Sequence, residues 1–134
     1  MPIIDRSRLR SLMEREQKRF VDDRPKSKAL FERGTKSLLG GVPMNWMLRW
    51  AGAFPPFVRE AQGAHFFDID GNRYVDFCLG DTGAMTGHTP EPVIRAVTGR
   101  IRRGVTFMLP TEDAIWVGNE LARRFRLPYW QFAL

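Results

Sequence analysis

The sequence predicts an α/β chain in which a small antiparallel sheet lies between helical segments. Three observations support this: helical spacing of apolar residues near the N-terminus, short alternating runs around an Asp-Gly turn, and two punctuated amphipathic segments near the C-terminus. Of the 134 residues, 43% are hydrophobic, which is enough for a modest core. Ten phenylalanines and four tryptophans argue against a disordered polymer.

Residues 1–36 predict an N-terminal helix followed by a charged linker. Apolar residues with helical spacing fall near one side of residues 5–20, at Leu9, Leu12, Met13 and Phe20. Pro25 is expected to end the helical structure, because proline lacks an amide donor and disfavours helix at the preceding residue.

Residues 37–88 predict an apolar loop followed by a three-stranded antiparallel meander. The loop mixes glycines and prolines with large apolar groups, so it must pack on the core, a partner or a ligand. Strand-like runs follow at 57–61, 64–69 and 73–79, and the Asp70-Gly71 pair suits a tight hairpin turn. His65, Phe67 and Ile69 are expected on one face.

Residues 89–134 predict two helices and the beginning of a strand. Thr89 is expected to cap the first helix, which Gly104 ends, with Val93, Val97 and Ile101 as its apolar stripe. Thr111 should begin the second helix, which Pro128 closes. The last residues, "YWQFAL", are expected to start a strand.

The net charge of +6 and the pI of about 10.2 raise the question of nucleic-acid binding. Eleven of the 21 basic residues fall in the first 36 residues, where six acids are interleaved with them, so a solvated helix face is favoured over a nucleic-acid surface. The single cysteine, Cys78, indicates a reducing, cytoplasmic location. No apolar run is long enough for a membrane helix.

The motifs point to no metal site. Asp68-x-Asp70-x-Asn72 begins like a calcium loop, but Arg73 and Leu79 stand where glycine and glutamate are required. His65 and His88 lack ligand spacing and are interpreted as structural, and Cys78 as a core residue. Gly80, Gly83 and Gly87 match no phosphate-binding motif, and they indicate either a tight backbone route or the wall of a ligand pocket.

Taken in order, several stretches resemble the N-terminal part of class III pyridoxal-phosphate-dependent aminotransferases, near the glutamate-1-semialdehyde aminomutase branch. These stretches are "LLGGV" at 38–42, "FPPFVREAQGAHFFDIDGNRYVDF" at 54–77, "GH" at 87–88 with the following "PEPVIRAV", and "TFMLPTE" at 106–112. The resemblance implies a fold-type I transferase. It implies that 37–88 forms the substrate-side loop and small-domain sheet, and that 89–134 begins the large cofactor-binding domain.

The resemblance also implies amino-group transfer through a Schiff base in a homodimer with pyridoxal 5'-phosphate. In the family, the phosphate loop, the acid that pairs with the ring nitrogen and the Schiff-base lysine all follow the region matched here. The only lysines, 18, 26, 28 and 36, precede the hairpin. We therefore expect no catalytic or cofactor-binding residue in this chain. We also expect no tight cofactor binding, no turnover and marginal stability or aggregation when it is isolated.

For the substrate, the resemblance implicates Trp46, Arg49 and Asp81. Met47 stands where aminomutases have a carboxylate-binding arginine, and Asp81 where family members often have tryptophan. These departures favour an aminotransferase for a different amino acid, with Arg49 holding a carboxylate. Two alternatives stay open: an aminomutase, and a small basic domain that binds nucleic acid or a protein through its aromatic loop.

Overall fold

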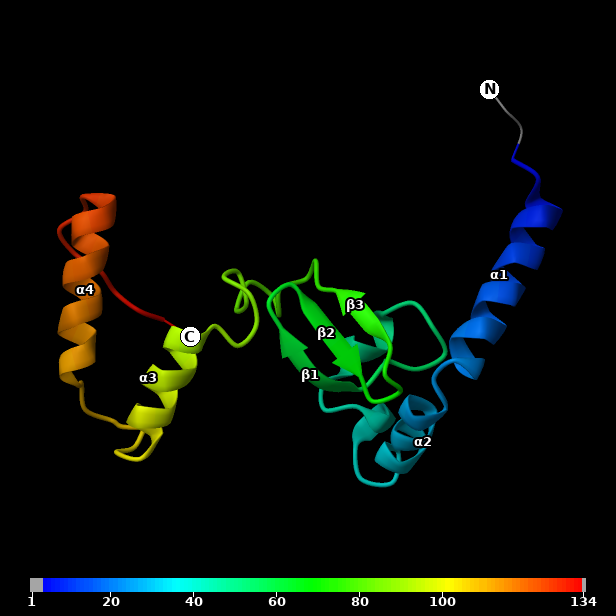
Figure 1. Cartoon of the computed structure of the whole chain (residues 1–134), viewed down its shortest axis with the longest axis horizontal. Helices are drawn as coiled ribbons and strands as arrows, with labels where there is room; N and C mark the ends of the chain where they lie inside the picture. The colour runs from blue at the N-terminus through cyan, green and yellow to red at the C-terminus, as the bar shows by residue number, and fades with distance from the viewer. Residues whose placement is uncertain (1–3, 134) are drawn as a thin grey trace. The chain divides into compact units, whose positions relative to one another are not determined.

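The computed structural model describes residues 4–133 (Figure 1). They form two compact units, of which the first ends at Glu91 and the second begins at Pro92. The predicted divisions at 36/37 and 88/89 concern the domains of the whole protein and stay predictions. Each unit is described by itself.

Helix α1 (Arg6–Asp22) is the predicted N-terminal helix. Its first turn is capped by Asp5, whose Oδ1 accepts hydrogen bonds of 3.0 Å from the amides of Ser7 and Arg8. An N-cap carboxylate satisfies amides that have no partner inside the helix and favours the positive end of the helix dipole. This explains why the helix begins directly after Asp5.

A second helix, α2 (Pro25–Gly34), lies where the sequence predicted a linker, so that prediction was wrong. Proline is tolerated in the first helical turn, where its missing amide costs no hydrogen bond. The residue before it, Arg24, provides no side-chain cap. The cap comes instead from the distant hairpin turn: Asp70 accepts bonds from the amides of Lys26 (2.7 Å) and Ser27 (2.9 Å) and from the Ser27 hydroxyl (2.7 Å).

The sheet of the first unit is the predicted antiparallel meander, ordered β1 (Val58–Gln62), β2 (His65–Asp68) and β3 (Arg73–Val75). Gly71 takes a φ of 95° in the turn between β2 and β3, as an Asp-Gly turn requires. The third strand is shorter than the predicted 73–79. It ends because Asp76 turns the chain by accepting bonds from the amides of Cys78 and Leu79.

A buried carboxylate joins this hairpin to the helices. Asp68 is fully buried and accepts hydrogen bonds from the Asn72 amide (2.8 Å), the Asn72 side chain (2.9 Å) and the Tyr74 hydroxyl (2.7 Å). Arg24 lies 3.9 Å away and also donates to the Tyr74 oxygen. Burial alone would raise the pKa of Asp68, but the donated hydrogen bonds outweigh it and hold that pKa below its usual range.

The apolar core of the first unit is small. Among the described residues, Val42 and Phe54 are the buried hydrophobic ones. The Phe54 ring packs against Phe20 of α1, with 5.3 Å between ring centroids, and against Phe31 of α2, with 6.3 Å. This cluster is where the loop after α2 returns to both helices.

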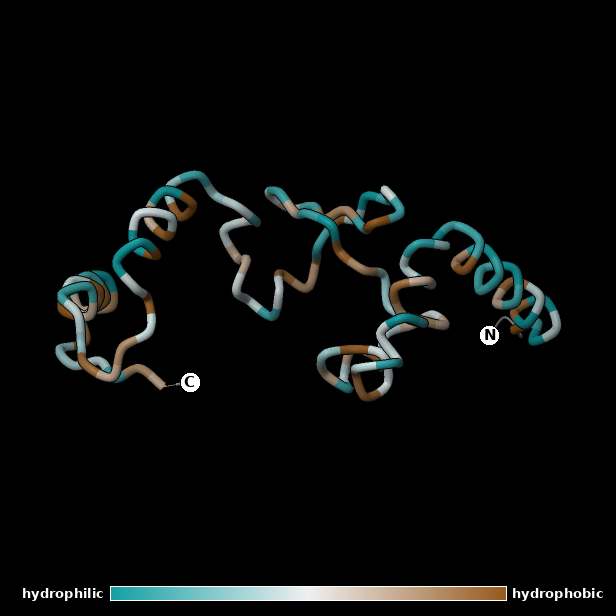
Figure 2. Tube along the Cα trace, turned by 90° about the horizontal axis from the view of Figure 1, so that it is seen from below, coloured by the Kyte–Doolittle hydropathy of each residue, from teal (hydrophilic) through white to brown (hydrophobic). Residues whose placement is uncertain are grey.

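In the second unit, α3 (Glu91–Ile101) and α4 (Glu112–Phe125) are the two predicted helices. Figure 2 shows hydrophobic and hydrophilic residues alternating along α3. The stripe of Val93, Val97 and Ile101 is more than half exposed. No helix of the described residues is both long and apolar enough to cross a membrane.

Two details of this region differ from the prediction. Thr89 does not cap α3; its hydroxyl donates to the Ala61 carbonyl oxygen at 3.3 Å, and α3 starts two residues later, after Pro90. Residues 129–133 form no strand. An isolated strand has no partner for its backbone groups, and in the described residues the only strands are those of the meander.

Candidate functional site

The loop between α2 and β1 folds into two short 3₁₀ helices, η1 (Leu39–Gly41) and η2 (Asn45–Arg49). Gly41 has a φ of +76°, and a Cβ atom there would lie 3.1 Å from the Phe31 carbonyl oxygen. A side chain at this position would be strained and would crowd Phe31. The close approach holds the start of the loop on α2 and leads the chain into η2.

This loop and the sheet line an apolar pocket of about 500 Å³ that is open to solvent. The indole rings of Trp46 and Trp50 meet edge to face, with centroids 6.4 Å apart. None of the pocket's lining residues carries a charge. The lining comprises Val42, Pro43, Trp46, Met47, Trp50, Pro55, Pro56, Phe57, Val58, Phe66 and Cys78.

The structure places only one of the three predicted substrate residues in the pocket lining. Trp46 lines the pocket, whereas Arg49 and Asp81 do not. Arg49 ends η2, is exposed, and makes no hydrogen bond or ion pair within residues 4–133. Asp81 lies in the loop after β3 with a φ of 55° and is exposed. Their roles stay predictions.

Cys78 was predicted to be a core residue, and that prediction was wrong. The thiol is exposed and lines the apolar pocket, because the chain turns at Asp76 before Cys78 can continue β3. The residues that the structure describes contain no cluster of histidine, cysteine or acidic side chains that could hold a metal ion.

Sequence reasoning missed the role of one pair, Asp76 and His88. The His88 Nε2 atom lies 2.6 Å from Asp76 Oδ2, and both side chains are largely buried. The His88 hydrogen bond, followed by that from the Leu79 amide, holds the pKa of Asp76 below its usual range. Twelve residues separate the pair, so no local spacing rule could have found it.

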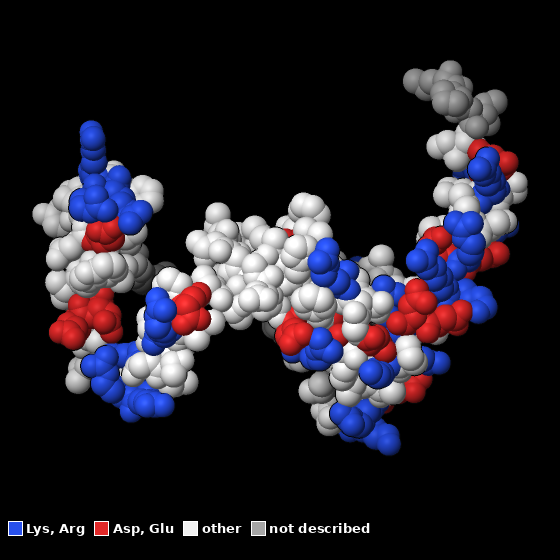
Figure 3. Space-filling view, in the orientation of Figure 1, with Lys and Arg blue, Asp and Glu red and all other residues white. Residues whose placement is uncertain are grey.

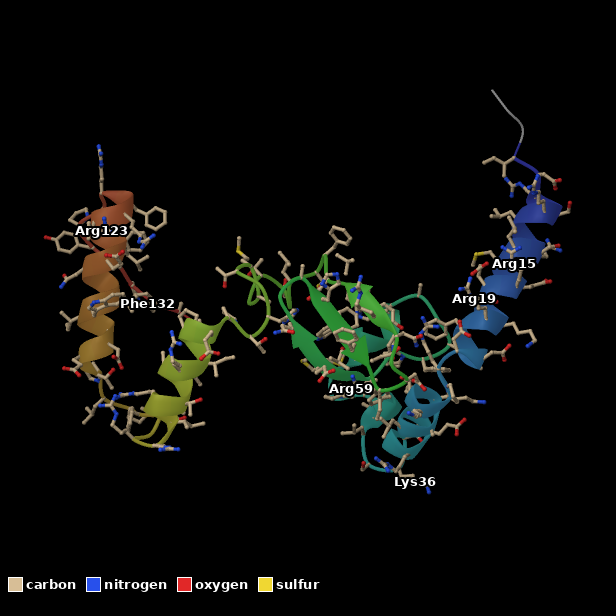
Figure 4. All side chains as sticks on the ribbon, viewed as in Figure 1. Arg15, Arg19, Lys36, Arg59, Arg123 and Phe132 are labelled. Carbon is tan, nitrogen blue, oxygen red and sulfur yellow. The ribbon has the colours of Figure 1, made fainter. Side chains whose placement is uncertain are left out.

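The basic residues do not gather at the pocket. On α1, positive and negative side chains alternate along the helix (Figure 3). Arg15 pairs with Glu16 at 2.9 Å and Arg19 with Asp23 at 3.4 Å. Figure 4 shows Arg15 and Arg19 extending from α1 and Lys36 in the loop after α2. These charged side chains of α1 are thus exposed and pair with neighbours of opposite sign.

The apolar pocket does not fit pyridoxal phosphate. Lys18 pairs with Asp22 on α1, Lys28 lies 3.8 Å from Glu32 on α2, and no lysine lines the pocket. The uncharged lining offers no cation for a phosphate group. The pocket residues by themselves therefore support no reaction step that involves the cofactor.

No protein-family model matches the chain. It is 39% identical to glutamate-1-semialdehyde 2,1-aminomutase of Methanocaldococcus jannaschii over 99 residues, which are 74% of this chain and 23% of that protein. The fold matches a crystal structure of a glutamate-1-semialdehyde aminomutase from Pseudomonas aeruginosa PAO1, with a TM-score of 0.87 and 51% identity over 96% of this chain and 28% of that one. An omega-transaminase from Sphaerobacter thermophilus matches at a TM-score of 0.66 with 30% identity, over 74% of this chain and 22% of that one.

These matches define the chain as part of a pyridoxal-phosphate-dependent transferase of fold type I. Within that class, it belongs to the class III aminotransferases and corresponds to a partial, N-terminal region. It spans about a quarter of the length of the relatives it matches. The resemblance noted in the sequence is thereby confirmed.

Proposed function

We propose that the whole protein is a pyridoxal-phosphate-dependent aminotransferase, and that this chain supplies the wall of its substrate site. The enzyme would transfer an amino group between an amino acid and a keto acid or aldehyde. The observation that carries the proposal is the uncharged pocket around Trp46 and Trp50 on the loop that resembles the family's substrate-side loop. Such a lining favours a substrate with an apolar or aromatic side chain.

In this proposal, the residues of the chain bind and orient the substrate, and residues outside it hold the cofactor. The bound cofactor would supply an electron sink for the amino-group transfer. The two indole rings would exclude water from the substrate's side chain. Arg49, exposed and without an ion-pair partner in the described residues, would hold the substrate carboxylate through two parallel hydrogen bonds. Asp81 would face the same substrate.

An aminomutase is the second candidate, because the relatives from Methanocaldococcus jannaschii and Cenarchaeum symbiosum carry that name. Against it stands Met47, which occupies the position of the aminomutases' carboxylate-binding arginine and lines the apolar pocket. A methionine cannot hold a carboxylate.

The proposal includes a homodimer, a cytoplasmic location and no binding of nucleic acid. The single cysteine supports the reducing location. The ion pairs along α1 speak against nucleic acid, since the cations there already have acidic neighbours. A nucleic-acid-binding domain would instead show an affinity that falls steeply with salt.

A chimera tests the proposed function. The matched segment of the Pseudomonas aeruginosa enzyme is replaced by this chain, and amino transfer is measured with a phenyl-bearing amino acid and with glutamate. We expect transfer from the phenyl-bearing donor, and a roughly tenfold lower kcat/KM for it after Trp46→Ala because apolar contact area is lost. Leu39→Ala is the matched control, since Leu39 is 94% exposed and lies outside the pocket. A folded chimera that transfers no amino group from either donor would refute the proposal.

A further inference from the structure

The glycine-rich loop at 79–88 is held in an unfavourable backbone conformation. Leu79, Asp81 and Thr82 have φ values of 56°, 55° and 74°, in the left-handed region that residues with a Cβ atom rarely adopt. They are three of the five such residues that the structure describes. Such a conformation persists only where surrounding contacts enforce it, and it is commonest at functional sites.

One carboxylate contacts both ends of this loop. At the start, Asp76 Oδ1 accepts hydrogen bonds of 2.9 Å from the amides of Cys78 and Leu79. At the far end, its Oδ2 lies 2.6 Å from His88 Nε2. The Asp76 side chain is 10% exposed and that of His88 is 23% exposed, so water has limited access to the contact between these two side chains.

The backbone at the far end is fixed to the sheet as well. Gly63, between β1 and β2, exchanges two hydrogen bonds with His88, of 3.0 and 2.8 Å. A Cβ atom on Gly87 would lie 3.2 Å from the Gly63 Cα atom, so the two backbones approach as closely as glycine allows. His88 thus provides a fixed anchor, and Asp76 ties the start of the loop to it.

We propose that Asp76 and His88 are positioning residues that clasp the two ends of loop 79–88 and thereby fix Asp81 on the substrate side of the enzyme. The clasp itself follows from the contacts above, while the placing of Asp81 against a substrate rests on the proposed function. Neither residue touches the reacting atoms.

Amide hydrogen exchange in the folded chimera tests the clasp without reference to activity. Asp76→Ala should speed exchange of the amides in 79–88 about tenfold and leave the peptide covering β1 and β2 unchanged. His88→Ala alone should also speed exchange of the amides in 79–88. Added to Asp76→Ala, it should cause no further increase in the exchange rate, because the two residues act through one contact. Asp81→Asn is the matched control in the same loop and should leave exchange unchanged.

The clasp is overturned if Asp76→Ala leaves exchange in the loop unchanged, or if the effects of Asp76→Ala and His88→Ala multiply. Should Asp76→Ala also expose β1 and β2, His88→Ala alone replaces it. This variant leaves the Asp76 carboxylate as the acceptor for the two amides and should speed exchange in the loop alone, so unchanged exchange would again overturn the clasp.

The second half of the proposal is measured in the chimera. Asp76→Ala should lower kcat/KM about tenfold, mainly by raising KM, because the substrate loses a fixed contact rather than a reacting group. Faster exchange with unchanged kinetics would overturn the placing of Asp81 and leave the clasp supported. A chimera without amino transfer refutes the proposed function, and the exchange experiment then decides the clasp alone.

Discussion

In the chimera, Asp68→Ala should lower the free energy of opening the β2–β3 hairpin by about 3 kcal/mol. The hairpin amides should then exchange their hydrogens roughly a hundredfold faster. The reason is the fully buried carboxylate on which Tyr74 and both donors of Asn72 converge, with Arg24 3.9 Å away. Its removal leaves the Tyr74 hydroxyl and the Asn72 backbone amide without an acceptor, while the Asn72 side chain keeps its 3.3 Å bond to the Asp23 carbonyl oxygen. An unsatisfied donor costs more than the net value of the bond it lost. The same turn carries Asp70, so the cap of α2 should loosen as well.

The control for this variant is Asp22→Ala, which removes an exposed carboxylate that pairs with Lys18 in the same unit. We expect a change below about 0.5 kcal/mol there, as for most surface ion pairs. If the hairpin amides exchange no faster in Asp68→Ala than in Asp22→Ala, the stabilising role of the hydrogen bonds to Asp68 would be contradicted.

Acid provides an independent check on Asp68. Because its pKa in the folded chain lies below the ordinary value, this carboxylate contributes stability above the ordinary pKa of about 3.9, and the contribution is lost as the pH falls through the lowered pKa. The wild-type hairpin should therefore open more steeply than the Asp68→Ala hairpin as the pH falls below about 4.

Arg49→Ala should raise the Michaelis constant for the amino donor by about 10- to 100-fold in the chimera, with a smaller change in kcat. The reason is the loss of a charge-assisted, two-bond contact to the substrate carboxylate. In the described residues, Arg49 is exposed at the end of η2 and has no ion pair that its loss would break. A change in the Michaelis constant would therefore report substrate binding rather than unfolding.

Arg59→Ala is the matched control for Arg49. Arg59 lies on β1 in the same unit (Figure 4) and is similarly exposed. It differs from Arg49 in pairing with Glu60. We expect a Michaelis constant within about twofold of the unsubstituted chimera. A value unchanged by Arg49→Ala would remove Arg49 from the substrate site.

The sequence was sufficient for the features that local chemistry determines. The helix over about residues 5–20, the meander around Gly71 and the helix after Thr111 all follow from turn residues and hydrophobic spacing. The family resemblance followed from the order of several short motifs. Each of these motifs alone is weak, and the resemblance is specific because all of them occur in the family's order.

Features that depend on distant contacts could not be predicted. The break before Pro25 was predicted and ends α1 at Asp22, but the helix that begins at Pro25 was missed, because its cap is Asp70, 45 positions later in the sequence. Cys78 was assigned to the core because the Asp76 turn that exposes it is not visible in an apolar run. The apolar pocket likewise requires the loop, the sheet and the Asp76 turn together.

The central claim is that this chain forms the substrate-side wall of a class III enzyme and that its cofactor is held by residues outside the chain. The most direct test is the absorbance spectrum of the 134-residue chain and of the chimera, each mixed with equimolar pyridoxal phosphate, dialysed and then treated with borohydride. We predict no retained cofactor band for the chain, and for the chimera a retained band that borohydride removes. A retained, borohydride-sensitive band in the chain alone, or a folded chimera without one, would contradict the claim.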